Sequence, residues 1–178
     1  PLSPPAASIT SPSSPETSRA ASNQSSVMSA ETRLMELGLI LPDVPAPVAS
    51  YVNCVRSGNL LYLSGGLPMV DGELVTGQVP RDISPEDAAV AARHVILNRL
   101  AVVRQELGSL DSVTRIVSLQ GFVSSAPDFY GHPGVINGAS DLLLEIFGER
   151  GKHSRIALGA AALPLNAAVE ISLVVEVA

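Results

Sequence analysis

SRIALGAAALPLNAAVEISLVVEVA, residues 154–178, ends the sequence and carries its clearest strand pattern. Two apolar runs, Arg155 to Leu163 and Ala167 to Val177, are separated by Pro164-Leu165-Asn166. Short apolar runs bounded by proline and asparagine are typical of β-strands, because proline cannot donate to a sheet ladder. We therefore predict that the chain ends in two strands of one sheet.

The residues before this stretch alternate between strand and helix patterns. Ser84-Pro85-Glu86-Asp87 has the capping serine, early proline and acidic first turn that begin a helix, and Gly108 ends it. The remaining predicted elements are a hairpin of strands 51–55 and 60–64, a glycine-rich loop 65–83, a strand 113–123 and a helix 135–147.

The predicted order of elements is therefore ββαβαββ. This order favours an α+β fold, a single mixed sheet with both helices packed on one face. The other face is too apolar to meet water, so we expect it to be buried against sister subunits. The sequence thus predicts an oligomer as well as a fold.

The N-terminal residues differ in composition from the rest. Residues 1–27 are dominated by Ser, Pro and Ala, which cannot build a core and predict disorder. A Ser-rich leader with little Arg also leaves an organelle transit peptide open as an alternative. Residues 28–48 predict a short helix, capped by Ser29 and ending at Gly38, and then a proline-rich linker. The domain itself is expected at 49–178.

The composition excludes several classes of function. The net charge of −6 disfavours a nucleic-acid partner, which needs a basic surface. Cys54 is the single cysteine, so no disulfide forms within the chain, and no Cys/His spacing resembles a zinc site. No apolar run is long enough to span a membrane, so we expect a soluble, cytoplasmic protein.

Familiar catalytic motifs are also absent. The sequence has no P-loop, dinucleotide-binding, nucleophile-elbow or zinc-protease pattern. His94, His132 and His153 are scattered over a helix and two loops. We interpret each of them as a surface or hydrogen-bonding residue rather than a metal ligand.

Two segments resemble the YjgF/RidA reactive-intermediate deaminase family. In SRIALGAAALPLNAAVEI, residues 154–171, an arginine opens a strand, Leu163-Pro164 follows, and Val169-Glu170-Ile171 closes the pattern. In SYVNCVRSGNLLYLSGGLP, residues 50–68, a tyrosine, a Gly-Asn turn and a Ser-Gly before proline resemble the family's first hairpin. The order of these motifs over most of 49–178 makes the resemblance specific.

The resemblance implies a chorismate-mutase-like fold that assembles as a trimeric barrel, with a site between subunits. It implies hydrolysis of 2-imino or enamine acids to 2-keto acids and ammonia, without metal or cofactor. Arg155 would hold the substrate carboxylate through its planar fork of donors, and Glu170 would orient or deprotonate the attacking water. The other implied substrate-binding residues are Tyr51, Ser64, Gly65 and Asn137.

The sequence also departs from the family pattern. Ile156 replaces a common serine, Ala157 a cysteine seen in some relatives, and Gly66 a frequent glutamine. A non-catalytic trimer that binds a small carboxylate metabolite therefore stays open as the alternative function. The residues alone leave Arg155 open as a solvated charge and Glu170 as the polar side of an edge strand. The charge disfavours an endoribonuclease, and chorismate mutase rests on fold analogy alone.

Overall fold

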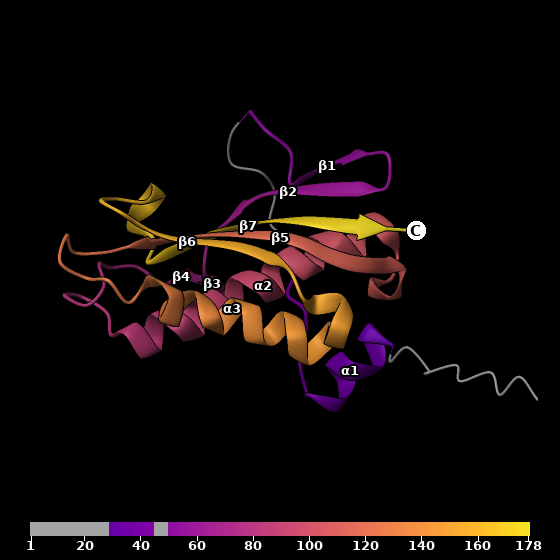
Figure 1. Cartoon of the computed structure of the whole chain (residues 1–178), viewed down its shortest axis with the longest axis horizontal. Helices are drawn as coiled ribbons and strands as arrows, with labels where there is room; N and C mark the ends of the chain where they lie inside the picture. Colours follow the sequence, from indigo (N-terminus) through magenta and orange to yellow (C-terminus); the bar gives the residue numbers. More distant parts are fainter. Residues whose placement is uncertain (1–28, 45–49) are drawn as a thin grey trace, which may run out of the picture.

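The computed structural model describes residues 29–44 and 50–178, which form one α+β body (Figure 1). Within these residues, five strands build the main sheet in the order β1-β2-β7-β5-β6. Strands β5 and β6 are parallel, and the other neighbours are antiparallel. The bounds are β1 Cys54–Ser57, β2 Leu60–Gly66, β5 Val113–Ser124, β6 Ser154–Ala160 and β7 Val169–Val177. The prediction of one mixed sheet is confirmed.

Two long helices, α2 (Pro85–Leu107) and α3 (His132–Phe147), cover one face of the sheet and lie below it in Figure 1. Helix α2 begins where predicted, because the Ser84 hydroxyl accepts a hydrogen bond from the Asp87 amide at 3.0 Å. Gly108 ends it in the left-handed conformation, with φ 79°. Helix α3 begins at His132 rather than at the predicted Val135, since a proline is tolerated in the first turn.

The predicted loop 65–83 contains a second, smaller sheet. β3 (Met69–Val70) pairs with β4 (Glu73–Leu74) across a turn in which Asp71 and Gly72 have φ of 51° and 84°. The loop prediction was wrong over these residues, because strands of two residues are too short to show an alternating pattern.

Strand boundaries differ from the predictions by a few residues. β1 is displaced from 51–55 to Cys54–Ser57, and β6 ends at Ala160 rather than at Leu163. Pro164–Asn166 forms a short 3-10 turn, and β7 begins after it. The two C-terminal strands are not neighbours, because β5 lies between them.

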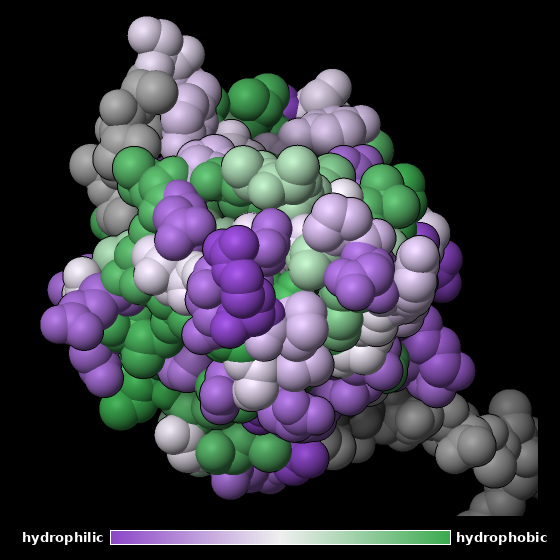
Figure 2. Space-filling model, turned by 90° about the vertical axis from the view of Figure 1, so that its left-hand side faces the viewer, coloured by the Kyte–Doolittle hydropathy of each residue, from purple (hydrophilic) through white to green (hydrophobic). Residues whose placement is uncertain are grey.

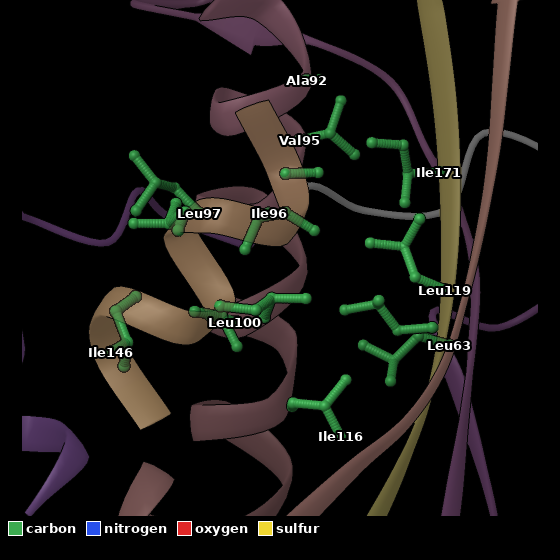
Figure 3. Packing of buried hydrophobic residues seen from close by; sticks show 14 of the residues in the cluster. Leu63, Ala92, Val95, Ile96, Leu97, Leu100, Ile116, Leu119, Ile146 and Ile171 are labelled. Atoms are coloured by element: carbon green, nitrogen blue, oxygen red, sulfur yellow. The ribbon is translucent and has the colours of Figure 1, made fainter. Parts of the chain in front are cut away.

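The core lies between the sheet and the two helices. Along β7, alternate residues are buried toward the helices, namely Val169, Ile171, Leu173, Val175 and Val177. Figure 3 shows Leu63 and Leu119 pointing from the sheet toward α2, where Val95 and Leu100 lie opposite. This packing fixes which residues of each strand face the helices and which face away.

Helix α1 (Ala30–Glu36) belongs to the same packed body. Ser29 caps it as predicted, by accepting from the Thr32 amide at 3.1 Å. Leu34 is buried in the core, and Glu31 forms an ion pair with Arg104 of α2 at 2.6 Å. The predicted disorder of 1–27 and the linker residues 45–49 lie outside the described residues.

The second face of the sheet carries no helix within the described residues (Figure 1). Three large apolar side chains on this face, Tyr62, Ile156 and Leu158, are 47%, 49% and 51% exposed. Ile156 and Leu158 belong to β6, on the edge of the sheet next to β5. We call this surface the open face.

Candidate functional site

Arg155 lies on the edge strand β6, and its side chain points toward the helices. Its partner in register is the buried Leu119, and paired residues share a face of the sheet. The Arg155 Nη1 donates to Asn137 Oδ1 at 2.8 Å and to Ser140 Oγ at 3.2 Å, both on α3. Two acceptors on one nitrogen orient the guanidinium, so the structure brings Asn137 and Arg155 together.

A second layer of hydrogen bonds orients Ser140. The His153 Nδ1 lies 2.6 Å from the Gly151 carbonyl, which only accepts, so this nitrogen carries the proton. In the neutral ring Nε2 then accepts from the Ser140 hydroxyl at 3.0 Å, and the Ser140 oxygen accepts from Arg155. Within the described residues the Nε–Nη2 edge of Arg155 has no partner, which leaves a bidentate donor edge for a carboxylate.

A pocket of about 260 Å³ opens beside this guanidinium. Its lining residues are Ser140, Leu144, Lys152, His153 and Arg155. Lys152 pairs with the exposed Glu149 at 2.8 Å, while Arg155 has no acidic partner among the described residues. The positive charge of the pocket favours an anionic ligand.

Glu170 lies on β7 and faces the open face. Its neighbours Val169 and Ile171 are fully buried under the helices, so strand alternation turns Glu170 the other way. The carboxylate covers Gly65, where an added Cβ would lie 2.9 Å from Glu170 Cδ. Burial raises the pKa of Glu170 above its usual value. A carboxylate with a raised pKa accepts a proton more readily than an exposed one.

Ser64 and Gly65 form a β-bulge in β2, at which the register with β7 shifts. The Ser64 hydroxyl donates to the Val52 carbonyl at 2.7 Å, and the Ser64 amide donates to the Asn53 carbonyl at 3.0 Å. These bonds hold the segment that follows Tyr51 against the bulge. Tyr51 itself is 47% exposed. The structure therefore brings Tyr51, Ser64 and Gly65 into one region.

Arg99 of α2 supports this bulge, and the sequence reasoning missed it. The residue is only 4% exposed, and its Nη1 donates to the Ser64 carbonyl at 3.2 Å. Its Nε is buried without a hydrogen-bond partner among the described residues. Burial lowers the pKa of Arg99, and the nearby Tyr51 and Cys54 act in the opposite direction. A buried cation thus lies under the segment that carries three of the predicted site residues.

The sequence does hold a signal for Arg99. It interrupts the apolar stripe of α2 between Ile96 and Val103, on the side of the helix that faces the sheet. The structure also explains Gly66, because an added Cβ there would lie 2.8 Å from the Arg99 Cδ. The arginine side chain occupies the space that a side chain at position 66 needs.

Arg155 and Glu170 do not meet within one subunit. Arg155 pairs with Leu119 of β5, and Glu170 pairs with Phe122 of the same strand. These two positions are three residues apart, so they face opposite sides of the sheet, because side chains alternate along a strand. The Cα atoms of Arg155 and Glu170 are about 14 Å apart. Their partners on β5 are three residues apart along the strand, and β6 and β7 are two strand spacings apart across the sheet. The predicted site falls into two halves, Arg155 with Asn137 and Glu170 with Tyr51, Ser64 and Gly65.

Within residues 29–44 and 50–178, no group of three or more His, Cys, Asp or Glu side chains could hold a metal ion. A search of the same residues for helices that are long and apolar enough to cross a membrane finds none.

The fold and the two half-sites define a small α+β protein with a chorismate-mutase-like architecture. Residues 31–177 match the family described as "YjgF/chorismate mutase-like, putative endoribonuclease". The chain belongs to this YjgF/RidA family, which confirms the resemblance found in the sequence.

Two similar proteins show how the family varies in name. Protein TCP17 of Trypanosoma cruzi is 44% identical over 80% of this chain and 91% of its own length. The 2-iminobutanoate/2-iminopropanoate deaminase of Dermatophagoides farinae is 30% identical over 76% of this chain and 92% of its own length.

Two solved structures share the fold closely. Protein Atu1372 of Agrobacterium tumefaciens, of unknown function, has a TM-score of 0.78 and 47% identity, covering 84% of this chain and 92% of its own. A protein of Shewanella oneidensis described as a putative endoribonuclease has a TM-score of 0.82 and 36% identity, covering 84% of this chain and all of its own.

Proposed function

We propose that this protein hydrolyses 2-imino acids, or the enamine acids from which they form, to 2-keto acids and ammonia. The observation that carries the proposal is the Arg155 guanidinium, oriented by Asn137 and Ser140 with its Nε–Nη2 edge free. That edge matches a carboxylate, and a 2-imino acid has one beside its C=N bond. The name of the Dermatophagoides farinae relative, an iminobutanoate and iminopropanoate deaminase, supports the same substrate class.

The proposed mechanism uses one group from each half-site. Arg155 holds the carboxylate and so fixes the adjacent imine carbon. Glu170 takes a proton from water while the water oxygen bonds to that carbon, and it returns the proton to the nitrogen. A second transfer, from the new hydroxyl to the nitrogen, breaks the C–N bond. Ammonia leaves, and the C=O bond of the keto acid forms.

A second copy of the chain completes the site in this proposal. Since Arg155 and Glu170 lie on opposite faces of one sheet, they can act on one substrate only if they come from different subunits. We propose a homotrimer in which the open faces turn inward as a barrel. The half-exposed Tyr62, Ile156 and Leu158 support it, because large apolar side chains on a sheet face are typical of a covered surface.

A binding module without catalysis is the second candidate. Ile156 and Ala157, which follow Arg155 on β6, are apolar where the family resemblance leads us to expect a serine and, in some relatives, a cysteine. Ile156 faces the open face and Ala157 the helices. The Ser64 hydroxyl already donates its proton to Val52. These features leave few polar groups for proton transfer, and they favour a trimer that binds a small carboxylate at Arg155.

A coupled assay separates the two candidates. Threonine dehydratase releases an enamine acid that hydrolyses slowly on its own, and the appearance of the 2-keto acid is followed with and without this protein. An enzyme accelerates keto-acid release in proportion to its concentration. A binding module leaves the rate at that of buffer, yet still binds 2-keto acids in a way that Arg155→Ala abolishes.

A further inference from the structure

Ser125 and His132 form a hydrogen-bonded pair outside both half-sites. Ser125 follows the last residue of β5, and His132 is the first residue of α3. The Ser125 Oγ and the His132 Nε2 lie 2.9 Å apart. In a neutral imidazole that is protonated at Nδ1, the Nε2 atom accepts the serine proton. This is the arrangement in which a histidine activates a serine as a nucleophile.

Both members of the pair are held in place by their neighbours. The Ser125 amide donates to the Ala160 carbonyl at 3.1 Å. The Phe129 ring packs edge-on against the imidazole of His132, with 5.2 Å between the centroids. An added Cβ at Gly159 would lie 2.6 Å from the Ser125 Oγ, so the glycine lets the pair pack against β6. The serine and the imidazole therefore have fixed positions relative to each other.

A pocket of about 320 Å³ opens on this pair, and we call it the Phe129 pocket. Its walls are mostly apolar, and the described residues that line it include no Asp, Glu, Lys or Arg. Figure 2 views this end of the molecule, where apolar and hydrophilic residues are interspersed on the surface. A small pocket with uncharged, apolar walls favours a neutral ligand with a short hydrocarbon group.

The described residues hold another Ser–His pair, Ser140 with His153, in a different environment. The Ser140 oxygen also accepts from the Arg155 guanidinium, and Lys152 lines the same pocket. A hydroxyl oxygen that accepts a hydrogen bond from a cation is a weaker nucleophile, because the cation attracts its lone pair. Ser125 receives no such bond from the described residues, so it is the better nucleophile of the two.

The start of α3 supplies positive potential beside the Ser125–His132 pair. The helix runs for 16 residues from His132, and its N-cap, Gly131, has no side chain that could bond to the first turn. The N–H groups of that turn and the helix dipole favour negative charge at this end. They therefore favour the oxyanion that forms when Ser125 adds to a carbonyl carbon.

We propose that Ser125 and His132 form a second catalytic site, which hydrolyses small uncharged esters. The Ser125 Oγ bonds to the ester carbonyl carbon while its proton moves to the His132 Nε2. The C–O bond to the alcohol breaks, and the alcohol leaves with that proton. Water then attacks the acyl group on Ser125 and gives a proton to His132. This proton returns to the Ser125 Oγ as the carboxylic acid is released. The activity is separate from imine hydrolysis and does not depend on it.

The first test uses diisopropyl fluorophosphate, a small uncharged reagent that phosphorylates activated serines. Mass spectrometry of the parent should show one diisopropylphosphoryl group per chain, and peptide mapping should place it on Ser125. Ser125→Ala should stay unlabelled, and His132→Gln should be labelled at least about tenfold more slowly. Ser124→Ala, at the buried neighbouring serine that does not line the pocket, is the matched control and should be labelled like the parent.

The second test measures turnover of 4-nitrophenyl acetate by the same proteins. The parent should release 4-nitrophenolate faster than buffer, and Ser125→Ala should release it at the rate of buffer. A parent that stays unlabelled, carries the label on another serine or hydrolyses the ester no faster than Ser125→Ala would overturn the proposal. The pair would then be a structural contact between the loop and α3. Labelling of the parent decides the question even if a variant fails to fold.

Discussion

The side chains of Arg155 and Glu170 lie on opposite faces of one sheet, the first turned toward α3 and the second toward the open face. Each is supported within its own subunit, Arg155 by Asn137 and Ser140, and Glu170 by its position over Gly65. The two half-sites are thus built separately, and the proposed reaction depends on how copies of the chain meet.

Replacement of Arg155 should affect activity far more than stability. We expect Arg155→Ala to lower kcat/KM roughly 30- to 1000-fold, because the carboxylate loses two charge-assisted hydrogen bonds. This decrease corresponds to a loss of about 2 to 4 kcal/mol of transition-state stabilisation. Arg155→Lys keeps the charge without the planar fork and should be intermediate. Initial rates in the coupled assay measure both effects.

The control for these variants is Arg115→Ala, which removes an exposed arginine from β5 outside both half-sites. All three proteins should melt within about 2 °C of the parent, since none of these side chains fills the core. Equal activity of Arg155→Ala and the parent would place the carboxylate site elsewhere.

Glu170→Gln should lower kcat with little change in KM, because the amide keeps the shape but cannot accept a proton. In the parent, kcat should fall as pH decreases through the pKa of Glu170, which burial raises above the usual glutamate value. This acidic limb should be missing from the residual activity of Glu170→Gln. A parent profile that is flat down to the usual glutamate range would contradict the base role.

The same pKa shift predicts a pH-dependent difference in stability. A carboxyl group whose pKa is raised in the folded state favours folding while it is protonated, and that contribution is lost as pH rises through the folded pKa. Glu170→Gln should therefore gain stability relative to the parent between pH 4 and pH 7. Urea unfolding at both pH values measures this, with Glu73→Gln, at an exposed glutamate of β4, as the control for the same substitution outside both half-sites.

Arg99 and Gly66 should be energetically coupled. Gly66→Ala places a Cβ against the Arg99 side chain and should cost about 1 to 3 kcal/mol of unfolding free energy. In an Arg99→Ala background the same change should cost much less, because the obstructing side chain is gone. The control is Gly134→Ala on α3, whose added Cβ meets nothing within 4 Å. Additive effects of the two substitutions would refute the contact.

The sequence predicted the long helices and strands because residues within or next to each element determine where it begins and ends. Helix α2 carries its own cap, first-turn proline and terminal glycine, so its bounds followed from the sequence. The β3–β4 hairpin and the order of β5, β6 and β7 depend on contacts between distant residues and leave no such pattern. The family resemblance assigned Arg155 and Asn137 to one site, and the hydrogen bond between them came from the structure.

The supporting residues were harder to foresee. In the sequence, Arg99 is a single charged residue in an apolar part of a helix. Its role as a donor to the Ser64 carbonyl is visible only in the structure. Ser125 and His132 come from either side of a loop, and only the position of Gly159 shows why they lie together. Such contacts depend on tertiary packing, which one sequence does not display.

Mixing of inactive variants tests the shared site most directly. Arg155→Ala and Glu170→Gln are each purified, unfolded, mixed in equal amounts and refolded, and the coupled assay is run on the product. In a random trimer about a quarter of the interfaces join an intact Arg155 to an intact Glu170, so activity should return to about a quarter of the parent value. Activity no higher than that of the two variants refolded separately, in a mixture that forms trimers, would contradict a site built from both subunits.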